Sequence, residues 1–179
     1  LFEISKATSK NVTMNFMKVD IVGLLKQVGL EYDSKREEAN LEFKWKLPEG
    51  KVILWLDSQK TYRIFENLIV NITKYALENT RVYIEMDVIG DQVRIVMKNV
   101  SASELNFDTE EITDRFVRGD VSRKTEGSGL GLAIAKSFTE LQGGTLRILT
   151  DADLFKVEIV FPCMKEGTDG RTEQNESDK

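Results

Sequence analysis

Apolar and polar residues follow one another in two different periods along the chain, and these periods predict helices and strands in turn. Apolar residues recur at helical spacing from Val19 to about Glu38, where Asp20 is placed to cap the helix. From Leu41 to Leu47 apolar and charged residues alternate strictly, which predicts a half-buried strand. The turn Pro48–Gly50 leads into a second strand, Val52–Leu56, which we expect to lie beside the first.

The second half of the chain continues this pattern. Asp57 and Ser58 are suited to cap a helix that runs through Tyr75, and Gly90 and Asp91 separate two strands as a hairpin turn would. The further strands are expected at Arg81–Ile89, Gln92–Lys98, Thr145–Thr150 and Phe155–Phe161, and a further helix at Leu132–Leu141. Helices and strands in this order predict an α/β (α+β) two-layer sandwich, in which a mixed, mostly antiparallel sheet carries helices on one face.

Four polar residues share one face of the predicted helix around Glu66–Ala76. Asn67, Asn71, Lys74 and Tyr75 stand at positions i, i+4, i+7 and i+8, and apolar residues fill most of the opposite face. An amide oxygen from Asn71 suits Mg²⁺, a lysine supplies positive charge for a phosphate, and a tyrosine ring offers a flat surface to a base. The alternative is the solvated face of an ordinary amphipathic helix. Because asparagines are poor helix formers, two of them in mid-helix favour a binding site.

Three alternating glycines, Gly127, Gly129 and Gly131, lead straight into the apolar helix that begins near Leu132. Backbone amides without neighbouring β-carbons can approach an anion closely. The N-terminus of the following helix would direct its unpaired N–H groups and its positive dipole end toward that anion. A loop that wraps phosphates is one interpretation and a tight turn without a ligand is the other, and the glycines alone leave both open.

The composition limits the class of protein. The 179 residues, of which 41% are hydrophobic and 31% charged, suffice for one well-buried domain but not for two ordinary ones. A net charge of −5 and scattered lysines and arginines argue against nonspecific nucleic-acid binding. The single cysteine, Cys163, cannot form an internal disulfide and offers no metal cluster, and no apolar stretch is long enough to cross a bilayer.

Four blocks in a fixed order carry a resemblance to a known family. Residues 67–75, 99–103, 115–120 and 127–132 resemble, in that order, the asparagine box, the first glycine box, the phenylalanine box and the second glycine box of the ATP-binding catalytic domain of bacterial sensor histidine kinases. That domain is one of the Bergerat-fold (GHKL) ATPases. The resemblance extends from about Val19 to about Pro162. It implies the Bergerat ATP-binding fold, ATP and Mg²⁺ as cofactors, and transfer of the γ-phosphoryl group to a protein histidine.

The resemblance also implies a role for each matching residue. Asn71 would bind Mg²⁺, Lys74 would approach a phosphate oxygen, and Tyr75 would pack near the adenine. Gly127, Gly129 and Gly131 would let the loop that contains them, the lid, fold over the triphosphate. Basic side chains nearby would neutralise the charge of the triphosphate. The expected nucleotide-binding residues are Asn67, Asn71, Lys74, Tyr75, Asn99, Arg118, Arg123, Lys124, Gly127, Gly129, Leu130, Gly131 and Leu132.

The first glycine box departs from the family pattern Asp-x-Gly-x-Gly, because this chain reads Asn99-Val100-Ser101-Ala102-Ser103. The amide oxygen of Asn99 can accept the hydrogen bond of the adenine amino group as an aspartate would, but without the charge. Loss of that charge would cost about 1 kcal/mol, or roughly fivefold in affinity. Serines at both glycine positions reduce the freedom of the backbone near the base.

Position 67 separates two branches of the family. The ATP-hydrolysing relatives place a glutamate four residues before the metal-binding asparagine to activate water, and this chain has Asn67 there. Glu66 is one residue away, about 100° around the helix, and would point away from that water. Because phosphoryl transfer asks mainly for positioning and charge neutralisation, the sequence favours a kinase over an ATPase.

The chain contains no histidine, so the phosphoacceptor that the family requires must lie elsewhere. We expect residues 1–18 to be the end of a dimerisation helix and a linker, residues 19–163 to be the catalytic domain, and residues 164–179 to be a disordered tail. The expected partners are the dimerisation domain and a response regulator, in a homodimeric parent of the bacterial cell membrane that holds this domain in the cytoplasm. Two alternatives stay open: a serine kinase of the anti-sigma type, and an interaction module that has lost productive nucleotide binding.

Overall fold

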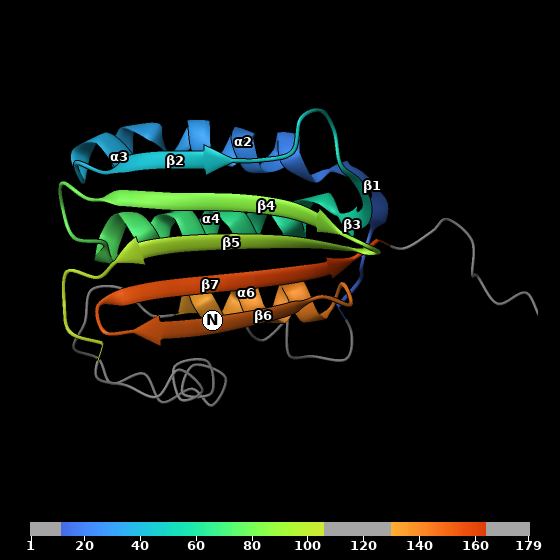
Figure 1. The fold of residues 1–179 in the computed structure, drawn as a ribbon. Helices are drawn as coiled ribbons and strands as arrows, with labels where there is room; N and C mark the ends of the chain where they lie inside the picture. The colour runs from blue at the N-terminus through green and yellow to red at the C-terminus, as the bar shows by residue number, and fades with distance from the viewer. Residues whose placement is uncertain (1–11, 106–129, 164–179) are drawn as a thin grey trace, which may run out of the picture.

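The computed structural model describes residues 12–105 and 130–163, which form two sheets and four helices (Figure 1). The elements in chain order are β1 (Phe16–Asp20), α2 (Ile21–Glu31), α3 (Asp33–Glu38), β2 (Glu42–Lys46), β3 (Ile53–Asp57), α4 (Ser58–Tyr75), β4 (Arg81–Ile89), β5 (Gln92–Val100), α6 (Leu130–Glu140), β6 (Thr145–Asp151) and β7 (Leu154–Pro162). None of these helices is both long and apolar enough to cross a membrane.

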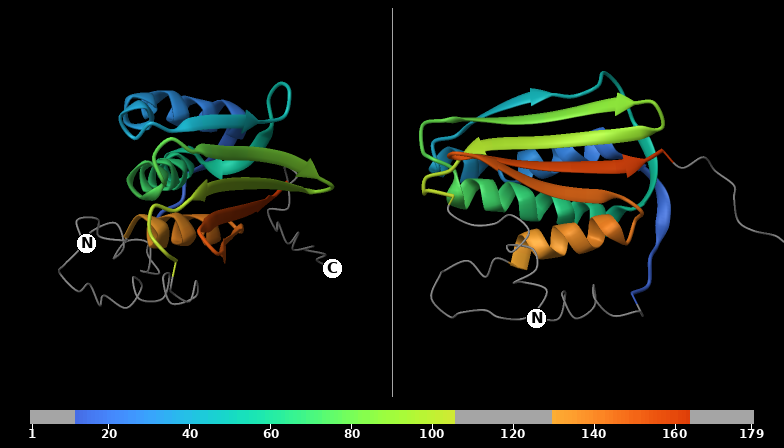
Figure 2. Two further views of the ribbon diagram at one scale, coloured as in Figure 1. Left: turned by 60° about the vertical axis from the view of Figure 1, so that its left-hand side comes forward. Right: turned by 60° about the horizontal axis from the view of Figure 1, so that its bottom comes forward.

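The larger sheet has five strands in the order β2-β4-β5-β7-β6. β2 runs parallel to β4, and all other neighbours are antiparallel. Helices α2, α4 and α6 lie together on one face of this sheet, as both views in Figure 2 show. Large apolar side chains such as Phe65 of α4, Ile84 of β4 and Phe161 of β7 are fully buried between the two layers. The predicted two-layer sandwich with a mixed, mostly antiparallel sheet is therefore confirmed.

The strands expected at Leu41–Leu47 and Val52–Leu56 do not lie side by side. β2 is an edge strand of the five-stranded sheet, whereas β3 pairs with β1 in a separate two-stranded sheet. The prediction was wrong because the turn between the strands reveals only a local reversal of the chain. The partner of each strand is set by distant contacts, such as the pairing of Leu54 with Val19, which are both buried.

The single helix expected from Val19 to Glu38 is divided. Its first residue belongs to β1, and Tyr32 separates α2 from α3 with φ of −102° and ψ of 13°. α3 contains no buried residue, whereas α2 buries one side in the core. The helix predicted from the apolar spacing was therefore longer than α2 at both ends, because the periodicity does not mark where the backbone leaves the helix.

Two aspartates precede helices, and only one of them acts as a cap. Asp57 Oδ1 accepts a hydrogen bond from the backbone N–H of Lys60 at 3.1 Å, as expected at the start of α4. Asp20 occupies the N-cap position of α2, but its side chain makes no capping hydrogen bond. Asp20 Oδ1 instead accepts a hydrogen bond from the backbone N–H of Val52 at 3.3 Å, so it joins α2 to the segment that precedes β3.

Glycines with positive φ occur in turns that connect the elements, and two of them show why glycine is suited there. Gly90, with φ of 60°, joins β4 to β5 next to the paired residues Ile89 and Gln92. Gly143, with φ of 77°, follows the end of α6 and donates a hydrogen bond to the carbonyl of Glu140 at 3.0 Å. Other residues adopt this left-handed conformation only at a cost.

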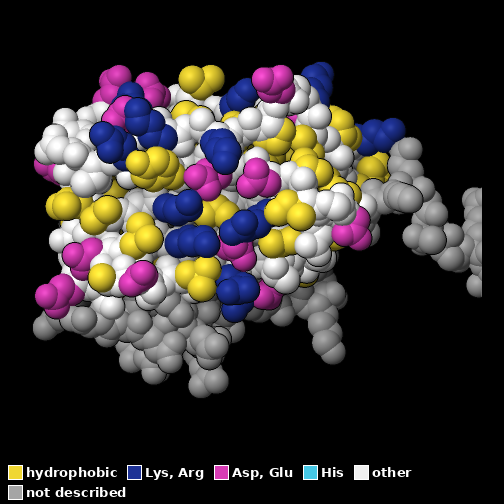
Figure 3. All heavy atoms as spheres, in the orientation of Figure 1, with side chains coloured by type: hydrophobic (Ala, Val, Ile, Leu, Met, Phe, Trp, Pro, Cys, Tyr) yellow, Lys and Arg dark blue, Asp and Glu magenta, His cyan; other side chains and the backbone are white. Residues whose placement is uncertain are grey.

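On the face of the five-stranded sheet that carries no helix, charged and apolar side chains are interspersed (Figure 3). Arg94 pairs with Glu158 at 2.9 Å, and Lys98 pairs with Glu85 at 3.1 Å. Val96 lies in register between these two glutamates and is only 3% exposed. The stems of the long side chains thus shield this apolar residue while their charged ends stay in water.

Candidate functional site

The polar face of α4 is open at its C-terminal end. Asn71 is half-buried, Lys74 and Tyr75 are exposed, and Ile72 on the opposite face is buried. The described part of the chain gives no hydrogen-bond partner to the side chains of Asn71 and Lys74. Both side chains are therefore available to a ligand that approaches this end of the helix.

The start of α6 packs against this same face at Asn67. A β-carbon at Gly131 would lie 3.2 Å from Asn67 Oδ1 and 3.6 Å from its Cβ and Cγ. Asn67 Nδ2 is buried and has no hydrogen-bond partner among the described residues. A buried amide without a partner costs free energy, so Asn67 retains a donor that a ligand between the two helices can satisfy. The structure thus brings the asparagine box together with the end of the second glycine box.

The first turn of α6 supplies backbone donors beside Asn67. The described part of α6 starts at Leu130, so the amides of Leu130, Gly131 and Leu132 lie in its first described turn. A helix that starts there leaves these N–H groups without an intrahelical acceptor. Leu132 is buried, whereas Leu130 and Gly131 are half-exposed. The exposed part of this turn fits an anion such as a phosphate.

The end of β5 is joined to the C-terminal end of α4. The backbone N–H of Leu77 donates to the carbonyl of Val100 at 2.8 Å, and that of Ala102 donates to the carbonyl of Tyr75 at 2.9 Å. Asn99 is only 4% exposed, and its Nδ2 donates to the carbonyl of Val100 at 3.2 Å. Asn99 and Tyr75, the two residues expected near the adenine, are therefore held at the same end of the domain.

The serines that replace glycines in this segment fit its backbone without strain. Neither Ser101 nor Ser103 has a positive φ. The N–H of Ser101 donates to the carbonyl of Asp153 at 2.7 Å, and Ser101 Oγ accepts a hydrogen bond from the N–H of Ser103 at 3.3 Å. The lost glycines therefore do not prevent the segment from reaching α4.

Glu66 is held on a different side of α4 from the ligand-facing residues. Its carboxylate accepts a hydrogen bond from the hydroxyl of Tyr32, between α2 and α3, and forms an ion pair with Arg63. Burial raises the pKa of the Tyr32 hydroxyl, and the hydrogen bond to Glu66 raises it further. The carboxylate is thus engaged by its own neighbours, in agreement with the direction expected from the helical geometry.

Several of the expected site residues lie outside the described residues. They are Arg118, Arg123, Lys124, Gly127 and Gly129, together with the block 115–120. Among the described residues, no cluster of histidine, cysteine, aspartate or glutamate side chains is arranged to hold a metal ion. A metal in this part of the site would have to use other ligands, such as the amide oxygen of Asn71.

A separate hollow of about 750 Å³ lies beside the start of β2 and β4. It is lined by Asn40, Leu41, Glu42, Asn79, Thr80, Arg81, Tyr83 and Val100. None of the expected site residues lines it, so we do not assign the nucleotide to it.

The sequence of residues 56–173 matches the family model described as histidine kinase-, DNA gyrase B-, and HSP90-like ATPase. The chain belongs to this family. It is 31% identical over 150 residues to the sensor histidine kinase WalK of Bacillus subtilis, and the aligned region covers 82% of this chain and 24% of WalK. It is 37% identical over 115 residues to the probable sensor protein PcoS of Escherichia coli, over 63% of this chain and 24% of PcoS. The chain thus spans about a quarter of the length of each relative.

Solved structures of histidine kinases share the fold of this member of the ATPase family. The nucleotide-free catalytic domain of the histidine kinase ThkA superposes with a TM-score of 0.73 at 20% identity, over 84% of this chain and 97% of that domain. Full-length ShkA in complex with AMPPNP gives a TM-score of 0.73 at 22% identity, over 89% and 34% of the two chains. ThkA in complex with the response regulator protein TrrA gives a TM-score of 0.70 at 17% identity, over 87% of this chain and 44% of that one.

Proposed function

We propose that this chain is the catalytic domain of a two-component sensor histidine kinase that binds Mg-ATP and transfers the γ-phosphoryl group to a histidine on a dimerisation domain. The observation that carries the proposal is the contact between Asn67 of α4 and Gly131 of α6. It joins an asparagine-bearing face to backbone donors at a helix N-terminus, and the relatives that match are sensor kinases.

The residues have distinct parts in this proposal. The amide oxygen of Asn71 fits Mg²⁺, because it is a hard ligand and its side chain has no described partner. The metal would supply positive charge to the phosphates. Lys74 would contact a phosphate, and Tyr75 and Asn99 would lie near the base. Arg118, Arg123, Lys124, Gly127 and Gly129 would contribute from the lid, and the amides of Leu130, Gly131 and Leu132 from α6.

The absence of a glutamate at position 67 favours the kinase within this family. Asn67 cannot take a proton from water, and Glu66 is engaged by Tyr32 and Arg63. An ordered γ-phosphoryl group can still pass to an external acceptor, because such transfer depends mainly on positioning and charge neutralisation. The lack of histidine in the chain assigns the acceptor to another domain.

The wider setting follows the same proposal. The expected boundary between a linker of residues 1–18 and a catalytic domain of residues 19–163 is shifted, because β1 begins at Phe16 and pairs with β3. We therefore propose that the catalytic domain includes residues 16–163, that the residues before it end a dimerisation helix and linker, and that residues 164–179 would be a tail. A response regulator would receive the phosphoryl group, and the parent protein would be a homodimer of the bacterial membrane with this domain in the cytoplasm.

Calorimetric titration with a non-hydrolysable ATP analogue, with and without Mg²⁺, tests the proposal. We expect magnesium-dependent binding to the wild type and its loss in Asn71→Ala. Gln59→Ala is the matched control, because Gln59 is an exposed amide near the opposite end of the same helix. A folded wild type that binds no analogue in any condition would instead support an interaction module that has lost its nucleotide.

A further inference from the structure

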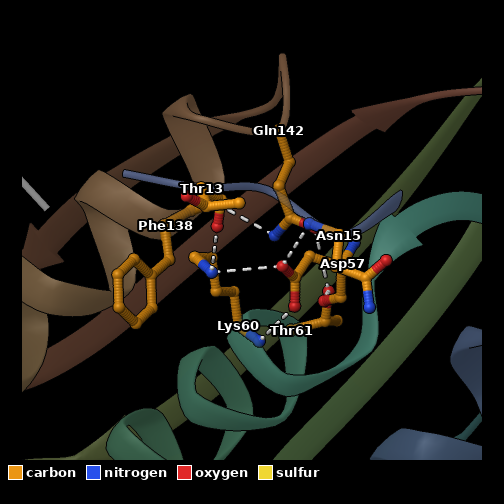
Figure 4. Close-up of polar contacts among 7 residues, drawn as sticks. All are labelled: Thr13, Asn15, Asp57, Lys60, Thr61, Phe138 and Gln142. Atoms are coloured by element: carbon orange, nitrogen blue, oxygen red, sulfur yellow. Dashed lines mark hydrogen bonds and ion pairs between the residues drawn. The ribbon is translucent and has the colours of Figure 1, made fainter. Parts of the chain in front are cut away.

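Three separate parts of the chain meet at the buried carboxylate of Asp57, at the end of β3 (Figure 4). Asp57 is only 3% exposed, and its carboxylate accepts three hydrogen bonds. The donors are the N–H of Asn15 at 2.9 Å, the N–H of Lys60 at 3.1 Å and the ammonium group of Lys60 at 3.1 Å. Lys60 Nζ also donates to the carbonyl of Thr13 at 3.2 Å. A buried carboxylate needs such donors, so Asp57 fixes the segment 13–15 to the start of α4.

Gln142, just beyond the end of α6, joins the same junction. It is 1% exposed, and its Oε1 accepts a hydrogen bond from the N–H of Asp57 at 2.8 Å. The hydroxyl of Thr61 lies 3.2 Å from the same oxygen, and its single proton is shared with the carbonyl of Asp57 at 2.8 Å. Gln142 Nε2 donates to the carbonyl of Phe138 at 3.0 Å. These bonds determine one orientation of the amide, because only its oxygen can accept from the N–H of Asp57 and only its nitrogen can donate to the carbonyl of Phe138. Gln142 thus attaches the C-terminal end of α6 to the N-terminal end of α4.

The junction and the candidate nucleotide site lie at two points along the same pair of helices. At the site, Gly131 of α6 contacts Asn67 of α4. At the junction, the ammonium group of Lys60 lies 6.0 Å from the ring centre of Phe138. Lys60 and Asn67 are seven residues apart on α4, and Gly131 and Phe138 are seven residues apart on α6. Seven residues of helix span roughly 10 Å, so the two contacts are separated by the same length on both helices. A shift of α6 along α4 at the junction would therefore displace Gly131 from Asn67 by a similar amount.

From this geometry we infer that Asp57 and Gln142 are positioning residues for nucleotide binding, and that they couple the incoming segment 13–15 to the site between α4 and α6. The inference rests on the proposed function. Asn15 belongs to the segment through which residues 1–11 join the domain, and its backbone N–H donates to the carboxylate of Asp57. The backbone N–H of the same Asp57 donates to Gln142. Displacement of this segment would remove a donor from Asp57 and loosen the hold on α6.

Gln142→Met tests the positioning role. It keeps the length of the side chain but removes the acceptor, which leaves the buried N–H of Asp57 without its partner. We expect affinity for the Mg-bound ATP analogue to fall about five- to tenfold, as one lost hydrogen bond predicts. The backbone amide signal of Gly131 in a ¹H–¹⁵N spectrum should also shift. Arg94→Met, which removes an ion pair on the open sheet face, is the control and should change neither.

Asn15→Pro tests the coupling, because it removes one backbone donor without changing α4 or α6. We expect the Gly131 signal to shift in the same direction as in Gln142→Met. Asn15→Ala keeps the N–H group and should behave as the wild type. If both Gln142→Met and Asn15→Pro leave the Gly131 signal and the affinity unchanged, the junction only stabilises the fold and the inference is wrong. A wild type that binds no nucleotide would defeat the proposed function, whereas the Gly131 signal would still report on the coupling.

Discussion

Gly131 of α6 lies so close to Asn67 of α4 that a β-carbon on the glycine would stand 3.2 Å from the amide oxygen of the asparagine. Gly131→Ala should therefore displace Asn67 by a few tenths of an ångström. Alanine favours the helix by about 1 kcal/mol, which offsets part of the steric cost to stability. We expect a small change in melting temperature with about fivefold weaker binding of the ATP analogue, measured by calorimetry. Unchanged affinity would mean that Asn67 does not contribute to the nucleotide site.

The serines of the altered first glycine box should be nearly neutral for binding. Ser101 and Ser103 have ordinary φ angles, so the folded backbone does not require glycine at either position. The double change Ser101→Gly, Ser103→Gly should therefore leave the folded conformation of this segment unchanged. We expect the free energy of unfolding to fall by up to about 1 kcal/mol per position through the greater entropy of the unfolded chain. Affinity for the ATP analogue should stay within about twofold. A large gain in affinity would show that the serines obstruct the base.

Glu66 should act as a structural residue. Glu66→Gln weakens the interactions with Tyr32 and Arg63, so we expect the free energy of unfolding to fall by about 1 kcal/mol. The rate at which phosphate is released from ATP should be the same in Glu66→Gln and in the wild type, and a coupled-enzyme assay can measure it. Loss of a true general base lowers a rate by about 10²- to 10⁴-fold, so a fall of that size would identify Glu66 as a catalytic residue.

Acid should weaken the fold through Asp57. Burial acts to raise the pKa of this carboxyl group, but the N–H of Asn15 and the donors of Lys60 outweigh it, and the net effect is a lowered pKa. The stability that follows is complete above the unfolded pKa of about 4 and is lost as the pH falls toward the lower pKa of the folded state. Asp57→Asn should thus be less stable than the wild type at neutral pH, with a difference that narrows below about pH 4. Urea unfolding at several pH values measures it, and a difference that stays constant with pH would contradict the assignment.

The sequence predicted best where a local period and the final packing agree. Along α4, the residues expected in the core, such as Leu68 and Ile72, are buried, and Lys74 and Tyr75 are exposed. The helical period carries this information because one face of α4 meets the sheet along its whole length. The bounds of strands β4 to β7 were also expected within two residues, and for β4 and β5 the turn at Gly90 marks where the strands meet.

Long-range pairing accounts for what the sequence did not reveal. β1 has five residues and depends on β3, which follows it by more than thirty residues, so no local pattern marks the strand. Gln142 resembles an ordinary polar residue after a helix, and its hydrogen bond to Asp57 spans 85 residues. The contact of Asn67 with Gly131 likewise depends on the packing of two helices. Each of these features arises only when distant elements meet.

The pairing of β5 with β7 has a consequence for how the domain tolerates a cut. Residues 12–105 and residues 130–163 are joined by a ladder that runs the full nine residues of both strands, and by the packing of α4 on α6. Besides the peptide link through residues 106–129, hydrogen bonds and apolar contacts between the described residues hold these parts together. Two polypeptides divided within that link should therefore reassociate into one folded domain, so the halves could be expressed separately and brought together as a reporter of assembly.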